Sequence, residues 1–174
     1  MAHAEQYDWC LNCKQLYTDY FINKDVLDVG SQDINGSNKV FFENCNYIGL
    51  DIGPGNNVDV VCKIHEYYPD KKFDTIISTE MLEHDSHFII SLKRMLELLK
   101  PGGLLVLTAA GHNRPEHGTE TEHPWCSPFT QNYYKNIYAE DLVNALNPEK
   151  NFIRFTIDYI PSSKDIRFVG IKNT

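Results

Sequence analysis

The chain has 174 residues, a net charge of −8 and a pI near 5.3. This length suits one domain with a single buried core, and the acidic balance argues against a DNA or long-RNA binder, whose affinity comes from neutralised phosphates. No apolar run approaches the roughly 20 residues of a membrane span, and the first residues lack a signal-peptide pattern, so we expect a cytoplasmic protein with no membrane partner.

The N-terminal segment 1–24 has a helical pattern, with apolar residues at Trp9, Cys13, Leu16 and Tyr20. We expect this helix to pack on the edge of a sheet. The chain has five cysteines, an odd number that favours free thiols. Cys10 and Cys13 have the spacing of a metal or redox pair, but no second pair accompanies them, and the place of Cys13 on the apolar stripe favours a structural role.

Seven short apolar runs bounded by turn residues predict strands at 26–29, 47–51, 58–62, 73–78, 104–110, 152–160 and 166–172. Helices are expected at 38–44, 88–99 and 139–146. The first five strands, joined by helices and loops, indicate parallel pairing, and the short connection 161–165 indicates an antiparallel final pair. The predicted fold is therefore α/β: a Rossmann-like three-layer sandwich with a seven-stranded, mostly parallel sheet, as a single domain over 1–174.

The first strand runs into a loop that begins at Gly30 and reaches Gly36. Such a loop, followed by a helix, places backbone N–H groups at the carboxyl edge of the sheet, where ligands of open α/β sheets bind. The same residue types also make ordinary turns, so the loop alone leaves both interpretations open.

Four segments together resemble the class I S-adenosylmethionine-dependent methyltransferases, especially their small type 11 branch. These segments are 26–31, 47–51, 73–84 and 99–107, and the resemblance covers nearly the whole chain. It implies S-adenosylmethionine as the methyl donor. The implied cofactor-binding residues are Asp28, Gly30, Ser31, Asp33, Gly36, Asp51, Ile52, Lys63, Ile64, Thr79 and Glu80.

The chemistry of the cofactor agrees with several of these residues. Gly30 lets the backbone approach the amino-acid end closely, and Asp28 can help to hold the ammonium. Asp51 ends the second strand about 20 residues further on, where a carboxylate can accept hydrogen bonds from a ribose diol. The alternative for Asp51 is an acid that closes a turn at a strand end.

Two departures from the family pattern stand out. Gln32 and Ile34 occupy positions where relatives have glycine, so we expect Asp33 to take over a polar contact. Lys63 stands where many relatives have an acid that accepts from the adenine amino group. Lysine cannot accept a hydrogen bond, so adenine recognition needs backbone or another acceptor such as Glu66.

The resemblance supplies no catalytic residue. Candidates near the expected methyl position are His84, with Glu83 beside it, and His112, because histidine titrates near neutrality. The long polar and aromatic segment 111–137 is interpreted as a lid over the substrate.

We therefore expect methyl transfer to an oxygen or nitrogen of a small molecule or an exposed polar group. Two alternatives remain: a non-catalytic binding module of the same fold, and a metal-dependent hydrolase built on His112, His117 and His123. We assign no metal ligands.

Overall fold

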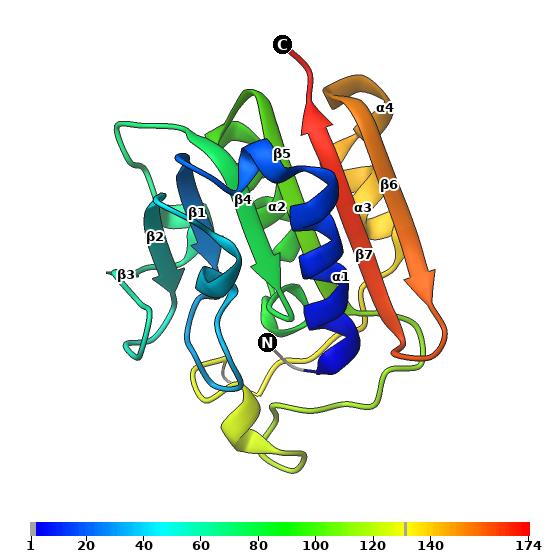
Figure 1. Cartoon of the computed structure of the whole chain (residues 1–174). Helices are drawn as coiled ribbons and strands as arrows, with labels where there is room; N and C mark the ends of the chain where they lie inside the picture. The colour runs from blue at the N-terminus through cyan, green and yellow to red at the C-terminus, as the bar shows by residue number, and fades with distance from the viewer. Residues whose placement is uncertain (1–2, 131) are drawn as a thin grey trace.

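The computed structural model describes residues 3–130 and 132–174, and its centre is a seven-stranded sheet with strand order β3-β2-β1-β4-β5-β7-β6 (Figure 1). The strands are β1 (Asp25–Val29), β2 (Asn46–Asp51), β3 (Val60–Val61), β4 (Phe73–Thr79), β5 (Leu99–Ala110), β6 (Phe152–Ile160) and β7 (Asp165–Lys172). Strands β1 to β5 pair in parallel, whereas β7 is antiparallel to both β5 and β6. The predicted mixed sheet is confirmed.

Helices cover both faces of this sheet. The α-helices are α1 (Ala4–Leu16), α2 (Phe88–Leu98), α3 (Ala139–Leu146) and α4 (Pro148–Asn151). Single 3-10 turns occur at Thr18–Tyr20, Asn38–Phe41, Ile64–Glu66, Leu82–His84 and Pro124–Cys126. Helix α1 lies on one face, and α2 and α3 lie on the other (Figure 1). Among the described residues, no helix is long and apolar enough to cross a bilayer.

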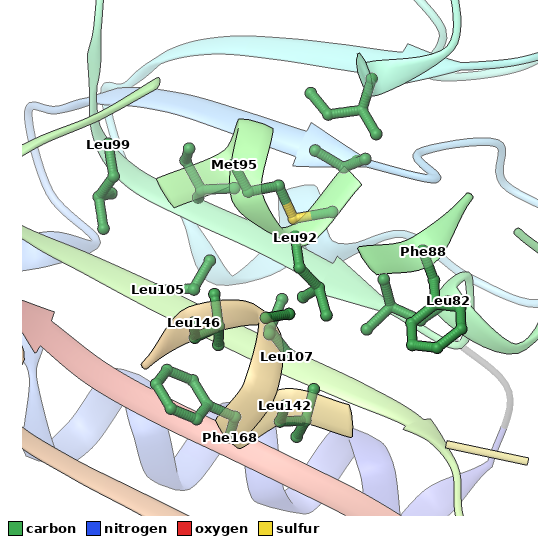
Figure 2. Close-up of a cluster of buried hydrophobic side chains, with 14 of the residues drawn as sticks. Leu82, Phe88, Leu92, Met95, Leu99, Leu105, Leu107, Leu142, Leu146 and Phe168 are labelled. Carbon is green, nitrogen blue, oxygen red and sulfur yellow. The ribbon is translucent and has the colours of Figure 1, made fainter. Parts of the chain in front are cut away.

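The larger core lies between the sheet and the pair α2 and α3. Figure 2 shows Leu92 and Met95 of α2 and Leu142 of α3 in one cluster with Leu107 of β5 and Phe168 of β7. All five side chains are at most 1% exposed. Because burying one such side chain contributes about 1.5–3 kcal/mol, this interface holds α2 and α3 against the sheet whose strand ends carry the site.

The N-terminal helix covers a face of the sheet, so the expectation that it packs on the sheet edge is wrong. The buried residues of α1 are Gln6, Cys10 and Cys13, and the two cysteines pack against β4, β5 and β7. Leu16, expected on the apolar stripe, is 69% exposed. The described cysteines are all free, and the burial of Cys13 confirms its structural role.

The helix expected at 38–44 is only the 3-10 turn Asn38–Phe41. The Ser37 side chain accepts a hydrogen bond from Lys39 N and starts the turn. Glu43 N then donates to Phe21 O, which draws the chain into an extended bridge and prevents a longer helix. Because the connection from β1 to β2 contains no α-helix among its described residues, the face of the sheet beside it is left for α1 to cover.

Replacing Leu92 with Ala tests the core that supports the site. Leu92 is a fully buried residue of α2, so we expect Leu92→Ala to lower the free energy of unfolding by about 2–5 kcal/mol. Ile90, on the same helix, is 54% exposed, and Ile90→Ala should change it by less than about 1 kcal/mol. Urea denaturation of both variants measures the difference, and equal losses would contradict this description of the core.

Candidate functional site

A cavity of about 390 Å³ lies at the carboxyl ends of β1, β2 and β4. All the residues predicted to hold the cofactor line this cavity except Asp33. The structure therefore brings them together from four separate parts of the chain. Their roles in binding the cofactor remain predictions.

Gly30 makes the sharp turn at the end of β1. Its φ is +82°, and a Cβ atom at this position would lie 2.7 Å from the Met81 side chain, so glycine is required on both counts. The N–H groups of Gly30 and Ser31 both donate to Leu50 O, at 2.8 and 3.1 Å. The expectation of bare N–H groups at this turn is therefore wrong, because β2 already uses them.

Asp33 does not line the cavity, and its side chain forms hydrogen bonds that hold the loop together. Its Oδ1 accepts a hydrogen bond from Gly36 N at 2.7 Å, and its Oδ2 accepts from Asn57 Nδ2 at 3.4 Å. The helix N-terminus expected after Gly36 is also missing, since only the 3-10 turn follows. Asp33 thus stabilises the path of a loop that lacks the usual glycines.

Asp28 is a buried carboxylate in the floor of the cavity. Its Oδ1 accepts from Asn38 Nδ2 at 3.0 Å and its Oδ2 accepts from the Tyr47 hydroxyl at 2.5 Å. Asn38 Nδ2 also lies 3.0 Å from Thr79 Oγ1. Burial raises the pKa of Asp28 to about 6, although both hydrogen bonds act in the opposite direction. Sequence reasoning missed Asn38 and Tyr47; the only signal was that a buried Asp28 needs donors.

Asp51 ends β2 on the cavity wall. Its two carboxylate oxygens accept from Gln32 N at 3.1 Å and from Gly53 N at 3.2 Å. Burial raises the pKa of Asp51 above its usual value. Each carboxylate oxygen can accept a second hydrogen bond, so the group keeps capacity for a ligand hydroxyl while it also shapes the turn.

At the end of the cavity expected to hold adenine, Cys62, Lys63 and Ile64 line the wall. Glu66, suggested as an acceptor in place of Lys63, does not line it. The Glu66 side chain is exposed and lies 3.8 Å from His65 Nε2. The structure therefore does not support Glu66 as the adenine acceptor.

The loop 111–137, of which residue 131 lies outside the described residues, passes below the strand ends (Figure 1). Its residues 126–130 line the cavity. A Cβ atom on Gly53 would lie 2.0 Å from Cδ2 of Phe129, so the Phe129 ring is seated directly on the Gly53 backbone. Arg114 fastens the start of the loop to Asp165 through a 2.8 Å ion pair.

The predicted catalytic histidines lie in different places. His84 lines the cavity, whereas the His112 ring lies outside it, with centroids 6.0 Å from Tyr138 and 6.3 Å from Tyr159. The expectation for His112 is thus corrected: Tyr159 donates to its carbonyl and holds it beside β6. Burial, with the neighbouring His117, lowers the pKa of His84 to about 4.

The three histidines of the hydrolase alternative do not converge. His117 packs against His84, His123 packs against Trp125, and His112 lies with the two tyrosines. Among the described residues, His112 and His123 belong to no group of potential metal ligands. The geometry gives the hydrolase alternative no support.

The raised pKa of Asp28 makes a stability prediction. A folded-state pKa of about 6, above the usual 3.8, means that stability is lost as pH rises from about 4 to 6. Asp28→Asn removes this titration. The free energy of unfolding of the variant minus that of the unmutated chain should therefore be roughly 1–3 kcal/mol larger at about pH 7.5 than at about pH 4.5. Denaturant unfolding at both pH values measures this. Asp70→Asn, at an exposed position, should show no such pH dependence; a pH-independent effect of Asp28→Asn would contradict the prediction.

Comparisons with known proteins place this cavity in a family. The methyltransferase domain model matches residues 1–147, and no curated protein matches the chain. The fold is similar to that of Burkholderia thailandensis 1,6-didemethyltoxoflavin-N1-methyltransferase with bound 1,6-didemethyltoxoflavin and S-adenosylhomocysteine (TM-score 0.62, 15% identity, covering 100% of this chain and 92% of that chain).

Two further solved structures share the fold. One is the N-methyltransferase NodS from Bradyrhizobium japonicum WM9 in complex with S-adenosylhomocysteine (TM-score 0.61, 15% identity, 97% and 86% covered). The other is Haemonchus contortus phosphoethanolamine N-methyltransferase 2 with S-adenosylmethionine (TM-score 0.65, 15% identity, 97% and 53% covered). The structural likeness shows the shared fold, and the match over residues 1–147 shows that the chain belongs to the methyltransferase domain family.

Proposed function

We propose that this methyltransferase uses S-adenosylmethionine to methylate an oxygen or nitrogen of a small molecule. The observation that carries the proposal is the cavity between Gly30, Asp51 and the lid, in a chain of the methyltransferase domain family. Its volume of about 390 Å³ lies within the range of small-molecule sites. The S-adenosyl ligands of the similar structures support the choice of donor.

The residues of the cavity fit the three parts of this cofactor. Asp51 has unused acceptor capacity for the ribose hydroxyls, and Ile52 and Ile64 offer apolar surface to adenine. Asp28 lies near the carboxyl end of β1 in the cavity floor, where a ligand ammonium would favour its ionised form. The tight packing of Gly30 on Met81 keeps this wall close to the ligand.

The cofactor supplies a methyl group that its sulfonium has already activated. The chain therefore has to hold the acceptor in line with the methyl group and to exclude water, while the acceptor forms its new bond to carbon, the S–C bond breaks and the acceptor releases its proton. Phe129 and Ser127 of the lid cover this space. His84, on the same wall, is neutral at pH 7 because of its low pKa. Its Nδ1 is buried, so we assign His84 to the cavity wall and not to removal of the proton.

Enclosure by the lid supports a small acceptor. The names of the similar structures include a didemethyltoxoflavin and a phosphoethanolamine methyltransferase, which both act on small molecules. The net charge of −8 argues against a nucleic-acid acceptor. Oxygen and nitrogen acceptors both fit beside the neutral His84 ring, which adds no charge to this wall.

A second candidate is a binding module without turnover. Two features support it. The N–H groups of Gly30 and Ser31 already donate to Leu50 O, and Lys63 stands where many relatives have an acid that accepts from the adenine amino group. Both features weaken cofactor binding. A measured affinity for S-adenosylmethionine with no methyl transfer to any oxygen or nitrogen nucleophile would favour this candidate.

Calorimetric titration with S-adenosylhomocysteine tests the proposed cofactor. We expect one site per chain, and Asp51→Ala should weaken binding by roughly 1–3 kcal/mol, because the ribose hydroxyls lose an acceptor. Asp70→Ala, at an exposed position, is the matched control and should bind as the unmutated chain does. Absence of heat and of a thermal shift at millimolar ligand would rule the proposal out.

Packing of Phe129 on Gly53 provides a test of the lid. Gly53→Ala would drive a methyl group into the Phe129 ring, so we expect weaker binding of S-adenosylhomocysteine. In the double variant Gly53→Ala with Phe129→Ala, the added methyl group has room, so this variant should bind no worse than Phe129→Ala alone. Additive losses in calorimetry would show that the lid does not rest on Gly53 in solution.

A further inference from the structure

A compact cluster of potential ligands lies beside the cavity. Glu83 and His84 come from the 3-10 turn after β4, and His117 comes from the lid. One ligand atom from each residue lies within 4.8 Å of the other two, and His117 Nε2 is 4.0 Å from Glu83 Oε1. His84 also lines the cavity, so the cluster adjoins the space assigned to the methyl acceptor.

Glu83 is the least satisfied polar group of the cluster. Its side chain is 0% exposed, and neither carboxylate oxygen makes a hydrogen bond of normal geometry, although the backbone N–H groups of Glu83 and Ala110 lie near enough to favour its charged form. Burial, together with the nearby Glu80 carboxyl, raises the pKa of Glu83 well above its usual range. A buried acid without a hydrogen bond of normal geometry is costly to the fold, which makes it a candidate ligand for a cation.

The His117 ring presents a lone pair to this acid. His117 Nδ1 lies 3.1 Å from Pro115 O, and a carbonyl oxygen can only accept, so Nδ1 carries the proton. Nε2, on the Glu83 side, is then an acceptor. At 4.0 Å the two groups are too far apart to share a hydrogen bond. A metal cation between them would bind both.

His84 adds the third donor. Its Nδ1 is buried and has no hydrogen-bond partner, and burial keeps the ring neutral by lowering its pKa. Gly118 allows the lid to come this close, because a Cβ atom at Gly118 would lie 2.7 Å from His84 Cε1 and its φ is +69°. The lid histidine is therefore held against the turn histidine by backbone that requires glycine.

We propose that Glu83, His84 and His117 bind one divalent transition-metal cation. With metal–ligand bonds of about 2.1 Å, tetrahedral ligand atoms lie about 3.4 Å apart, so the three ligand atoms, now within 4.8 Å of one another, approach by up to about 1.4 Å when the cation binds. Two imidazoles with one carboxylate favour Zn²⁺, Co²⁺, Fe²⁺ or Mn²⁺ over Mg²⁺ or Ca²⁺. The cation would also fasten the lid to the turn after β4.

The position of the cation indicates a role that rests on the proposed function. With three protein ligands, the cation keeps open positions beside the cavity, where an acceptor hydroxyl can bind. A metal-bound hydroxyl loses its proton to solvent more readily, and the resulting oxygen forms the bond to the methyl carbon as the S–C bond breaks. This arrangement favours a hydroxyl-bearing acceptor over an amine.

Metal titration without cofactor tests the site. Chelator-treated full-length chain is titrated with Zn²⁺, Mn²⁺ and Mg²⁺ by calorimetry, and with Co²⁺ by visible absorption, which reports the coordination geometry. We expect one equivalent of transition metal, with Mg²⁺ much weaker. Glu83→Gln and His117→Ala should each weaken binding at least about 100-fold. His123→Ala, in the same loop but packed on Trp125, is the matched control and should bind normally.

The outcomes are distinct. Absence of stoichiometric binding, or equal binding by the two ligand variants and the unmutated chain, would overturn the site. Thermal unfolding and S-adenosylhomocysteine binding by His117→Ala, measured without metal, show whether that variant is folded. Because the titration contains no cofactor, failure of cofactor binding would contradict the proposed function and leave the metal result standing, and the reverse also holds.

Discussion

The site depends on how the buried Asp28 carboxylate is held. Asp28 on β1 accepts hydrogen bonds from Tyr47 of β2 and from Asn38, and Asn38 in turn bonds to Thr79 of β4. This network ties three strands together at their carboxyl ends, where the cavity opens. A carboxylate with a raised pKa is expensive to bury in its charged form, so the fold carries a strain that a cationic ligand group would relieve.

The fold was largely predictable because short apolar runs and the turn residues between them locate its strands. All seven strands were predicted, with the antiparallel final pair, since buried strands are short, β-branched and bounded by turn residues. The place of α1 was not predictable in this way. A helical stripe shows that one face is buried but not against which surface. The deciding fact is that the connection from β1 to β2 forms only a 3-10 turn, which leaves a face of the sheet open.

The residues that line the cavity were predictable from the sequence, but their hydrogen-bond partners were not. Asp28, Gly30 and Asp51 lie at strand ends, so topology alone brings them together. The partners of Asp28 come from a turn and a neighbouring strand, and the ring of His112 turns towards β6; neither follows from spacing along the chain. The convergence of His117 on Glu83 depends on the path of the lid, which a sequence pattern does not determine.

These features describe a small methyltransferase with a cavity at its strand ends, and the position of the cofactor that we propose there is the central claim. A crystal structure of the chain with S-adenosylhomocysteine tests it most directly. We predict the ribose hydroxyls within hydrogen-bond distance of the Asp51 carboxylate, with the amino-acid end beside Gly30. Density for the ligand elsewhere, or ribose hydroxyls turned away from Asp51, would contradict the account.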